Sequence, residues 1–546
     1  MTETLTASNN TATVEPTAAK AAIEQLEVCG ITTIFGIPGV HTLALYDALH
    51  DSNLTHILAR HEQGAGFMAD GFARATGQPA LALVITGPGV TNVATPIGQA
   101  YTDSSPVFVL SSNVERDHLD AMRGNLHDLK DQRAVMRAVT KWNDRALEPA
   151  DVPQMIATAY AEMMRGRQLP VHLEIPIDVL DEPVGGFPSV SSEVPESPPV
   201  DSAEQIASAA EALASAELPM IYCGGGATAA AAGASILAIA EQLGAPIVTS
   251  IQGKGSVPDG HPLVCGTFWT QGNAIDDLAR RADLLLVVGS KLGVQATERF
   301  TFPIPDTLIR IDIDPHEMAR NATPSIGIVG DAASVTAQIA CDLVARPTLS
   351  CWAKDEIDEA RTLARQSAFG VDRIAWLEAI RAAVPDDGCI AWDMTMMSYV
   401  AGYHFPVYQP RTFLFPSGFG TLGFALPAAI GAKVGLGKRT VAAVVGDGGY
   451  QFTMQELATA VQFRLGIPVI IFNDSTYSAV KAEQHSSRDQ RYSAVDLVNP
   501  DYVKLADAYG VPGVRVTSPE ALQTAITDAL SRDLPTLIDV PIDGWV

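Results

Sequence analysis

Residues 440–449 read TVAAVVGDGG, and residues 468–474 read PVIIFND. Each is a short apolar run that ends in glycine or polar residues. This pattern is typical of a strand buried on both faces of a parallel sheet. Ligands of open parallel sheets bind at the carboxyl ends of the strands. The glycines and carboxylates after these two runs therefore mark a candidate binding site at one edge of a predicted sheet.

The sequence GDG at 446–448 favours a metal ion and a phosphate at that edge. Glycine lets the backbone approach a phosphate closely, and Mg²⁺ prefers oxygen ligands such as those of the Asn-Asp pair at 473–474. A helix expected to begin near Thr453 would direct its amide groups at the same phosphate. The alternative is a glycine turn beside two surface acids. A dinucleotide site is disfavoured, because the third glycine of its motif would fall on Gln451.

Similar apolar runs recur along the chain and group into three α/β blocks. We expect an N-terminal domain over 1–184, a middle domain over 200–345 and a C-terminal domain over 365–546. A stretch rich in Pro, Ser and acids at 181–202 is the clearest linker. The fold class predicted is α/β, with three doubly wound parallel-sheet domains.

The first and third blocks share an internal pattern. Residues 64–89 align without a gap on residues 423–448, and both segments contain an Ala-rich helix, a break, a buried strand and a Gly-x-Gly turn. Chance matching of small residues is the alternative. Two similar domains that faced each other would form a natural cleft.

The composition of the 546 residues excludes several classes of protein. Hydrophobic residues make up 47% and charged residues 18%, which suits several packed cores. A net charge of −26 disfavours nucleic acid and anionic membranes as partners. The sequence has no apolar run long enough for a membrane span and no signal-peptide pattern at its start. The six cysteines are scattered without a CxxC pair, so we expect a cytoplasmic protein.

Six motifs give the chain a family resemblance. They are FGIPG (35–39), RHEQGAGFMADGFARATG (60–77), TGPGVTN (86–92), SGFGTLGFALPAAIGA (417–432), GDGGYQFTMQEL (446–457) and NPDYVKLADAYG (499–510). Over nearly its full length the chain resembles the acetolactate synthase-like and 2-oxo-acid decarboxylase branch of the thiamin-diphosphate enzymes. The resemblance implies a pyrimidine-binding, a middle and a diphosphate-binding domain.

The resemblance also implies roles for particular residues. Glu62 matches the catalytic carboxylate that hydrogen-bonds N1′ of thiamin diphosphate, although a plain solvated acid at a helix start is the alternative. Asp447, Asp474 and the Thr476 carbonyl would bind Mg²⁺, with Asp474 in place of the family's usual asparagine. The implied cofactor-binding residues are Gly420, Leu422, Thr395, Ser398, Gly446, Gly448, Gly449 and Tyr477.

The reaction implied is decarboxylation of a 2-oxo acid through a C2 ylide and an enamine, with release of an aldehyde. The pocket residues depart from those of acetolactate synthases. A Phe-Gln-Glu segment appears as Leu126-His127-Asp128, a tryptophan as Glu483 and a substrate-binding arginine as Lys291. Flavin-site residues are not recognisable, so FAD is not expected.

These departures make His127 a candidate catalytic residue, although an exposed loop histidine is the alternative. The candidate substrate contacts are Val40, His41, Asp128 and Glu483. The two acids suit a cationic, guanidino 2-oxo acid. Rival functions are an acetolactate synthase-type carboligase, a coenzyme A-thioester decarboxylase, and an inactive subunit or scaffold that binds thiamin diphosphate.

The resemblance further implies a homodimer or homotetramer with active sites between chains. In the middle block, the glycine run 224–226 follows a predicted strand and favours a tight turn over a nucleotide-phosphate site.

Overall fold

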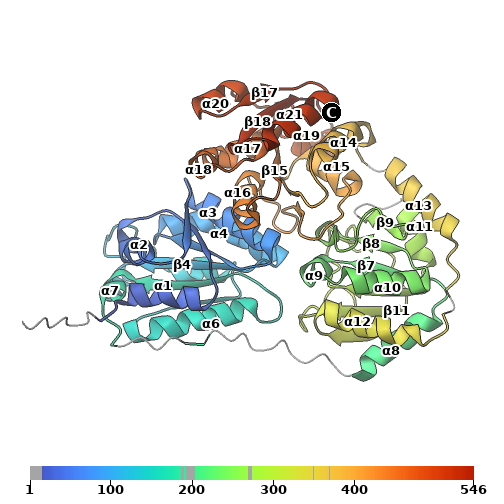
Figure 1. Ribbon diagram of the computed structural model, residues 1–546, viewed down its shortest axis with the longest axis horizontal. Coiled ribbons are helices and arrows are strands. Elements are labelled where there is room, and N and C mark those ends of the chain that lie inside the picture. Colours follow the sequence, from blue (N-terminus) through green and yellow to red (C-terminus); the bar gives the residue numbers. More distant parts are fainter. Residues whose placement is uncertain (1–14, 186–189, 192–202, 269–273, 349, 368) are drawn as a thin grey trace, which may run out of the picture.

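The computed structural model describes residues 15–185, 190–191, 203–268, 274–348, 350–367 and 369–546. Within these ranges the chain forms three six-stranded parallel sheets with flanking helices, which confirms the predicted fold class (Figure 1). Most of the predicted linker, at 186–189 and 192–202, lies outside the described residues. None of the described helices is both long and apolar enough to cross a membrane.

The first sheet has the strand order β2-β1-β3-β4-β6-β5. Successive residues of β3 point to opposite faces, so Leu81 and Leu83 join one apolar core and Ala82 and Val84 join another. Its strands are β1 (Thr33–Gly36), β2 (Thr55–Leu58), β3 (Ala80–Val84), β4 (Val107–Asn113), β5 (Trp142–Arg145) and β6 (Val171–Pro176). Its helices are α1 (Ala18–Val28), α2 (Leu43–His50), α3 (Glu62–Thr76), α4 (Pro88–Asp103), α5 (Gln132–Arg137), α6 (Val152–Met164) and α7 (Ile177–Asp181).

The third sheet repeats this order as β14-β13-β15-β16-β18-β17. The identical topology confirms that the internal pattern in the sequence reflects two related units. Its strands are β13 (Cys389–Trp392), β14 (Phe413–Leu414), β15 (Val441–Gly446), β16 (Pro468–Asn473), β17 (Gly513–Arg515) and β18 (Thr536–Pro541). Its helices are α14 (Ile374–Ala383), α15 (Met396–His404), α16 (Ala425–Leu436), α17 (Asp447–Thr453), α18 (Leu457–Gln462), α19 (Ser478–Ser487), α20 (Tyr502–Ala508) and α21 (Pro519–Leu530).

The middle sheet has a different order, β12-β11-β10-β7-β8-β9. Its first three strands in sequence therefore lie on one side of the switch point, and the last three lie on the other. Its strands are β7 (Pro219–Cys223), β8 (Ile247–Thr249), β9 (Val264–Thr267), β10 (Leu284–Val288), β11 (Thr307–Asp312) and β12 (Ile326–Val329). Its helices are α8 (Ala203–Ser215), α9 (Gly225–Ala229), α10 (Gly233–Leu243), α11 (Ala274–Arg281), α12 (Ala332–Val344) and α13 (Lys354–Ser367).

Helices α3 and α16, which belong to the two related sheets, pack against each other near the centre of the molecule (Figure 1). Glycines allow this close approach. A Cβ on Gly71 would overlap the backbone of Ala428, and one on Gly431 would overlap the backbone of Met68. One continuous apolar core accordingly includes residues of both sheets. This packing fixes the first unit against the third within one chain.

Candidate active site

The carboxyl edge of the third sheet carries the predicted metal and diphosphate residues. Strand β15 ends at Gly446, and α17 begins directly at Asp447, so the expected helix start near Thr453 is wrong. The reason is local: Gly446 has an extended backbone (φ −86°, ψ 158°) and serves as the N-cap, which leaves no intervening loop. Asp447 therefore lies in the first helical turn, at the end of a buried strand.

Asp447 is mostly buried, and its Oδ2 accepts a hydrogen bond from Nδ2 of Asn499 at 2.6 Å. The same Asn499 nitrogen donates to Oδ1 of Asn473 at 3.0 Å. Asp474 accepts hydrogen bonds from the Ser478 hydroxyl and from its own loop backbone. Burial, together with repulsion from the nearby Asp474 carboxylate, raises the pKa of Asp447 to about 6. Two close carboxylates of this kind favour a cation between them.

The residues at this edge fit a magnesium diphosphate. A Cβ on Gly446 would lie 2.7 Å from the Thr395 hydroxyl, and one on Gly448 would lie 2.6 Å from the Tyr477 ring, so glycine keeps the backbone open. The Ser398 hydroxyl is buried and has no hydrogen-bond partner within the described part of the chain. In the part of the chain that the structure describes, no group of three or more His, Cys, Asp or Glu residues could hold a metal ion. A donor set of two carboxylates completed by carbonyl and phosphate oxygens suits Mg²⁺.

Asn499 and Asp393 are site residues that the sequence analysis missed. Asp393 follows β13 and is fully buried. Its carboxylate accepts hydrogen bonds from the backbone of Met394 at 2.8 Å, Gly423 at 3.1 Å and Ala425 at 3.2 Å. It thereby ties the predicted pyrimidine-binding loop at 420–422 to the end of the strand. An acid directly after the apolar run CIAW is the signal that could have identified it.

Glu62 begins α3 in the first unit, where the His61 ring caps the helix by accepting from the Gln63 amide at 3.1 Å. Nδ2 of Asn92 in α4 donates to Oε2 of Glu62 at 2.9 Å. Among the described residues no hydrogen bond or ion pair joins Glu62 to Asp447. The structure thus brings Glu62 together with polar groups of its own unit.

The structure brings His41 and His127 together from separate segments. Their ring centroids lie 5.4 Å apart in an edge-to-face arrangement. His41 is largely buried in a short helical turn after β1, next to Val40, whose side chain is 62% exposed. Burial, and then the nearby His127 ring, lower the pKa of His41. Among the residues that the structure describes, neither Nδ1 atom of the two rings has a hydrogen-bond partner, so both rings retain polar groups for a ligand.

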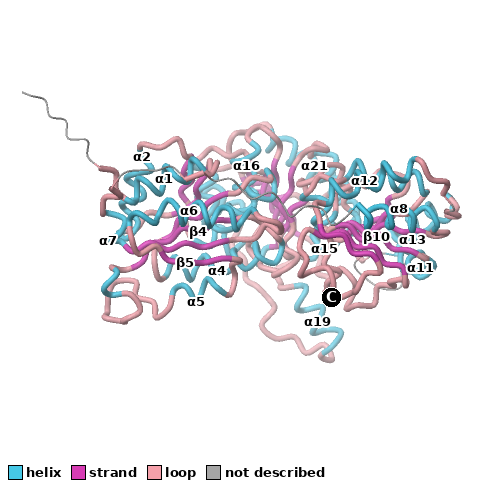
Figure 2. Tube along the Cα trace, turned by 90° about the horizontal axis from the view of Figure 1, so that it is seen from below, coloured by secondary structure: helices cyan, strands magenta, loops and turns pink. Residues whose placement is uncertain are grey.

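Among the described residues, no hydrogen bond or ion pair joins the two predicted substrate acids, Asp128 and Glu483. The Asp128 carboxylate accepts hydrogen bonds from the backbone of Gly124 at 2.8 Å and of Asn125 at 2.9 Å, within its own loop. Glu483 is exposed on α19, which extends away from the rest of the chain (Figure 2). No hydrogen bond or ion pair between described residues links Glu483 to the loop of His127.

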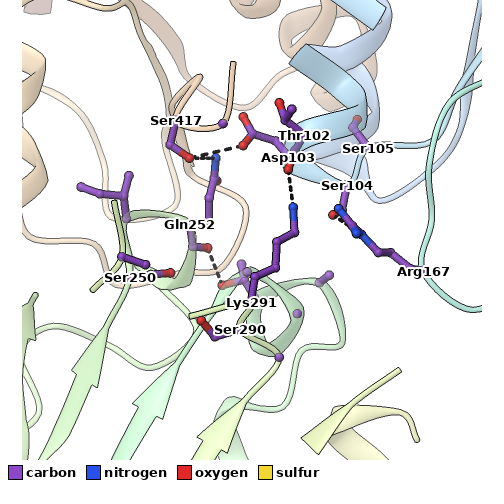
Figure 3. A pocket seen from close by; sticks show the side chains of 18 of the residues that line it. Thr102, Asp103, Ser104, Ser105, Arg167, Ser250, Gln252, Ser290, Lys291 and Ser417 are labelled. Atoms are coloured by element: carbon purple, nitrogen blue, oxygen red, sulfur yellow. Dashed lines mark hydrogen bonds between the residues drawn. The ribbon is translucent and has the colours of Figure 1, made fainter. Parts of the chain in front are cut away.

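A cavity of about 780 Å³ lies where the three units meet (Figure 3). Lys291 reaches across it, and its Nζ donates to the carbonyl of Thr102 at 2.7 Å. Burial lowers the pKa of Lys291 to about 8. Gln252 donates to the carbonyl of Phe415 at 2.8 Å and to the Ser417 hydroxyl at 2.9 Å. The cavity wall is therefore hydrogen-bonded to the segment that leads into the 420–422 loop.

The glycine run of the middle unit has a packing role. A Cβ on Gly224 would overlap Gly289, and one on Gly226 would lie 2.7 Å from the Cα of Gly289. The turn after β7 thus packs against the turn after β10, in agreement with a tight turn. The same glycines at 225–226 also line the cavity.

Comparison with known proteins gives the following matches. Residues 16–135 match the N-terminal, residues 206–339 the central and residues 393–540 the C-terminal domain model of thiamine pyrophosphate enzymes. A probable 2-ketoarginine decarboxylase of Pseudomonas aeruginosa is 40% identical, covering 95% of this chain and 91% of the relative. A probable acetolactate synthase large subunit of Methanocaldococcus jannaschii is 34% identical, covering 96% and 92%. The large subunit of Escherichia coli acetolactate synthase isozyme 3 is 32% identical, covering 96% and 95%.

These matches extend over nearly the whole chain and include the segments that carry Glu62, Asp447 and Asp474. The three-sheet architecture agrees with the three matched domains. The chain belongs to the thiamine pyrophosphate enzyme family.

Proposed function

We propose that this protein decarboxylates a 2-oxo acid with thiamin diphosphate and Mg²⁺ and releases an aldehyde. The observation that carries the proposal is the carboxylate pair Asp447 and Asp474 at the ends of the adjacent strands β15 and β16. It lies in a chain that the three thiamine pyrophosphate enzyme models match. A relative named as a probable 2-ketoarginine decarboxylase supports decarboxylation.

Three segments of the C-terminal unit would hold the cofactor and its metal. Asp447, Asp474 and the Thr476 carbonyl would bind Mg²⁺, and Asn499 orients the first of these carboxylates. The diphosphate would rest on the backbone at 446–449, beside the Tyr477 ring. The hydroxyls of Thr395 and Ser398 would donate to it. Gly420 and Leu422 would hold the aminopyrimidine, on a loop that Asp393 fixes.

Bound thiamin diphosphate supplies the electron sink that a 2-oxo acid needs to lose its carboxylate as CO₂. Glu62 would move a proton through Oε1, because its Oε2 already accepts from Asn92. His127 delivers from its ring the proton that the aldehyde gains in place of CO₂. His41 lies against His127 and would orient its ring.

A guanidino 2-oxo acid is the substrate we favour. The printed name of the 40% identical relative refers to 2-ketoarginine, which carries a guanidinium tail. Asp128 and Glu483 supply negative charge for such a tail, with Val40 as an apolar contact for its methylene groups. Glu483 would then approach the pocket from the second chain of an oligomer.

The second candidate is an acetolactate synthase-type carboligase, favoured by relatives of that name at 34% and 32% identity. Lys291, which would bind the carboxylate of a second 2-oxo acid, instead donates to Thr102 across the inter-domain cavity. The carboligase therefore lacks its expected acceptor contact. We also propose no FAD in this enzyme, because flavin-site residues are not recognisable in its sequence.

We further propose that the protein is a homodimer or homotetramer whose active sites lie between the 1–184 domain of one chain and the 365–546 domain of another. Two aromatic rings near the proposed site are about half exposed. They belong to Phe419, which precedes Gly420, and to Phe452 in α17. A second chain would cover these rings. We also propose a cytoplasmic location, because the six cysteines are scattered through the sequence without a CxxC pair.

The decisive experiment measures CO₂ and products from pyruvate, 2-oxobutyrate, branched, aromatic and guanidino 2-oxo acids, with thiamin diphosphate and Mg²⁺ present. We expect one aldehyde per CO₂, fastest with the guanidino acid. A condensed hydroxy-ketone would identify the carboligase. Bound cofactor without consumption of any 2-oxo acid would identify an inactive subunit and reject the proposal.

A further inference from the structure

A buried polar cluster lies beneath the segment that carries His127. Gln132, the first residue of α5, is 1% exposed and Glu174 of β6 is fully buried. Nε2 of Gln132 donates to Oε2 of Glu174 at 2.9 Å. Arg145 of β5 donates from Nε to the other oxygen of Glu174. The buried carboxylate is thus fully paired, as a charge removed from water must be.

Gln132 also joins the ends of two neighbouring strands, β3 and β4. Its Nε2 donates to the carbonyl of Ser112 at the end of β4, at 2.9 Å. Its Oε1 accepts from the Thr86 hydroxyl at 2.8 Å and from the Gly87 amide at 2.9 Å, just after β3. A single side chain therefore locks the turn before α4 to the neighbouring strand. The same α4 carries Asn92, the partner of Glu62.

The locked turn supports His127 directly. Gly87 has φ +66°, and a Cβ placed on it would lie 2.5 Å from the carbonyl oxygen and 3.0 Å from the Cβ of His127. His127 itself has φ +67°, a backbone conformation that costs free energy unless neighbouring contacts hold it. The position of the histidine is thus set by contact with a turn that Gln132 holds.

Arg145 connects the same cluster to the middle of the His127 loop, residues 114–131. Its Nη1 donates to Oδ2 of Asp120 at 3.0 Å and its Nη2 to Oδ1 at 3.3 Å, a two-pronged contact. Asp120 has φ +59° and is about half exposed. The loop is therefore attached at its centre by Arg145 and at its end by Gln132.

We propose that Gln132, Glu174 and Arg145 are positioning residues that hold the 114–131 loop, so that His127 stays against Gly87 and His41. None of the three is assigned a contact with substrate or cofactor; they act through the loop. The inference rests on the proposed function, because it is the role of His127 in decarboxylation that makes its position matter. Misplacement of a reacting group by about 1 Å can lower a rate by about 100-fold.

The first test is Asp120→Asn in the full-length holoenzyme, because Asp120 is exposed enough for the variant to fold. We expect kcat to fall about tenfold, with the KM for the 2-oxo acid and the Kd for thiamin diphosphate within about twofold of wild type. Amide hydrogen exchange in the 119–128 segment should accelerate about tenfold. Asp120→Glu, which keeps the carboxylate, should restore most of kcat.

Asp117→Asn is the matched control, because Asp117 is an exposed carboxylate of the same loop that makes no hydrogen bond or ion pair with the described residues. It should leave kcat and exchange unchanged. Gln132→Glu probes the other attachment, since it removes the amide donor and places a second carboxylate against Glu174. We expect the same kcat loss with cofactor binding retained. If this variant does not fold, Asp120→Asn alone decides.

Wild-type kcat and wild-type exchange in Asp120→Asn would overturn the inference, as would faster exchange with unchanged kcat. The hydrogen-exchange measurement does not depend on turnover. A chain that consumes no 2-oxo acid would therefore disprove the proposed function while the attachment of the loop is still measured.

Discussion

At the residue scale, the position of Glu62 depends on its place at a helix start and on one hydrogen bond. It is the first residue of α3, and its Oε2 accepts from Asn92 one turn into α4. The hydrogen bond fixes one oxygen and leaves the other for a ligand. A helix-start glutamate without such a partner would point into solvent, and its carboxylate would be of little use for proton transfer.

Glu62→Gln tests this role. The amide cannot exchange a proton near neutral pH, so we expect kcat to fall at least about 100-fold while the protein still binds thiamin diphosphate. CO₂ release and the cofactor content of the purified variant measure the two quantities. Glu211→Gln, on the exposed face of α8, is the control and should match wild type. Activity within a factor of a few of wild type would exclude Glu62 as the catalytic carboxylate.

Glu456 links the two related units through a buried carboxylate. It accepts hydrogen bonds from the Arg60 amide at 3.2 and 3.1 Å and from the Thr459 hydroxyl at 2.9 Å. Burial raises its pKa from 4.5 to about 7. The folded chain therefore binds the proton more tightly than the unfolded chain. The stabilisation is complete below about pH 4.5 and is lost as the pH rises to about 7.

Glu456→Gln should remove this pH dependence, because an amide does not titrate in that range. We expect the urea midpoint of wild type to fall more between about pH 5 and about pH 8 than that of the variant. Urea unfolding followed by fluorescence at both pH values makes the comparison. Parallel pH profiles for the two proteins would show that Glu456 does not titrate between these values.

At the element scale, the contact of α3 with α16 depends on the absence of side chains. Gly71 and Gly431 bring the two helix backbones together, and the Phe67 and Phe424 rings pack edge to face with centroids 5.7 Å apart. Glycine within a helix is less favourable than alanine by about 1 kcal/mol. The close packing of the two helices offsets this cost.

Gly431→Ala should lower the free energy of unfolding by about 3 kcal/mol or more, because its Cβ would overlap the Met68 backbone and rigid backbone cannot yield. Chemical denaturation gives the value. Gly293→Ala is the control, since a Cβ there meets no atom within 4 Å. If Gly431→Ala lowered the free energy of unfolding no more than Gly293→Ala does, close packing of α3 against α16 would not contribute to stability.

At the scale of the whole molecule, two sheets of identical strand order carry the two halves of the proposed site. Glu62 and His127 belong to the first unit, and Asp447 and Asp474 belong to the third. No hydrogen bond or ion pair between described residues connects these two groups within the chain. In the proposed homodimer or homotetramer, a second chain would complete the active site.

Subunit mixing tests this arrangement. Glu62→Gln and Asp447→Asn should each be inactive alone. If the site lies between chains, unfolding and refolding the two variants together should restore about a quarter of wild-type activity, since half of the dimers are mixed and each has one intact site. Size-exclusion chromatography reports the assembly. A mixture as inactive as its parents would place the whole site within one chain.

The sequence by itself determined the fold class, the family and the carboxylates at the ends of β15 and β16. These features can be predicted from the sequence because they depend on residues that are close together in the chain. They are apolar runs of strand length, glycine turns and the acids that directly follow them. The glycine run at 224–226 was also readable as a turn.

Only the tertiary structure decided which side chains position those residues. Glu456 and Arg60 are 396 positions apart, Thr421 and Gln99 are 322 apart, and Asn499 and Asp447 are 52 apart. In the sequence, nothing distinguishes Gln132 from other polar residues at helix starts. Its role depends on its contacts with β3, β4 and β6, which form only in the folded chain. The helix start at Asp447 also differed from the expectation, because the backbone angles of Gly446 set it. A hydrogen bond depends on distance in space, and the distance between remote residues is fixed only when the sheets pack.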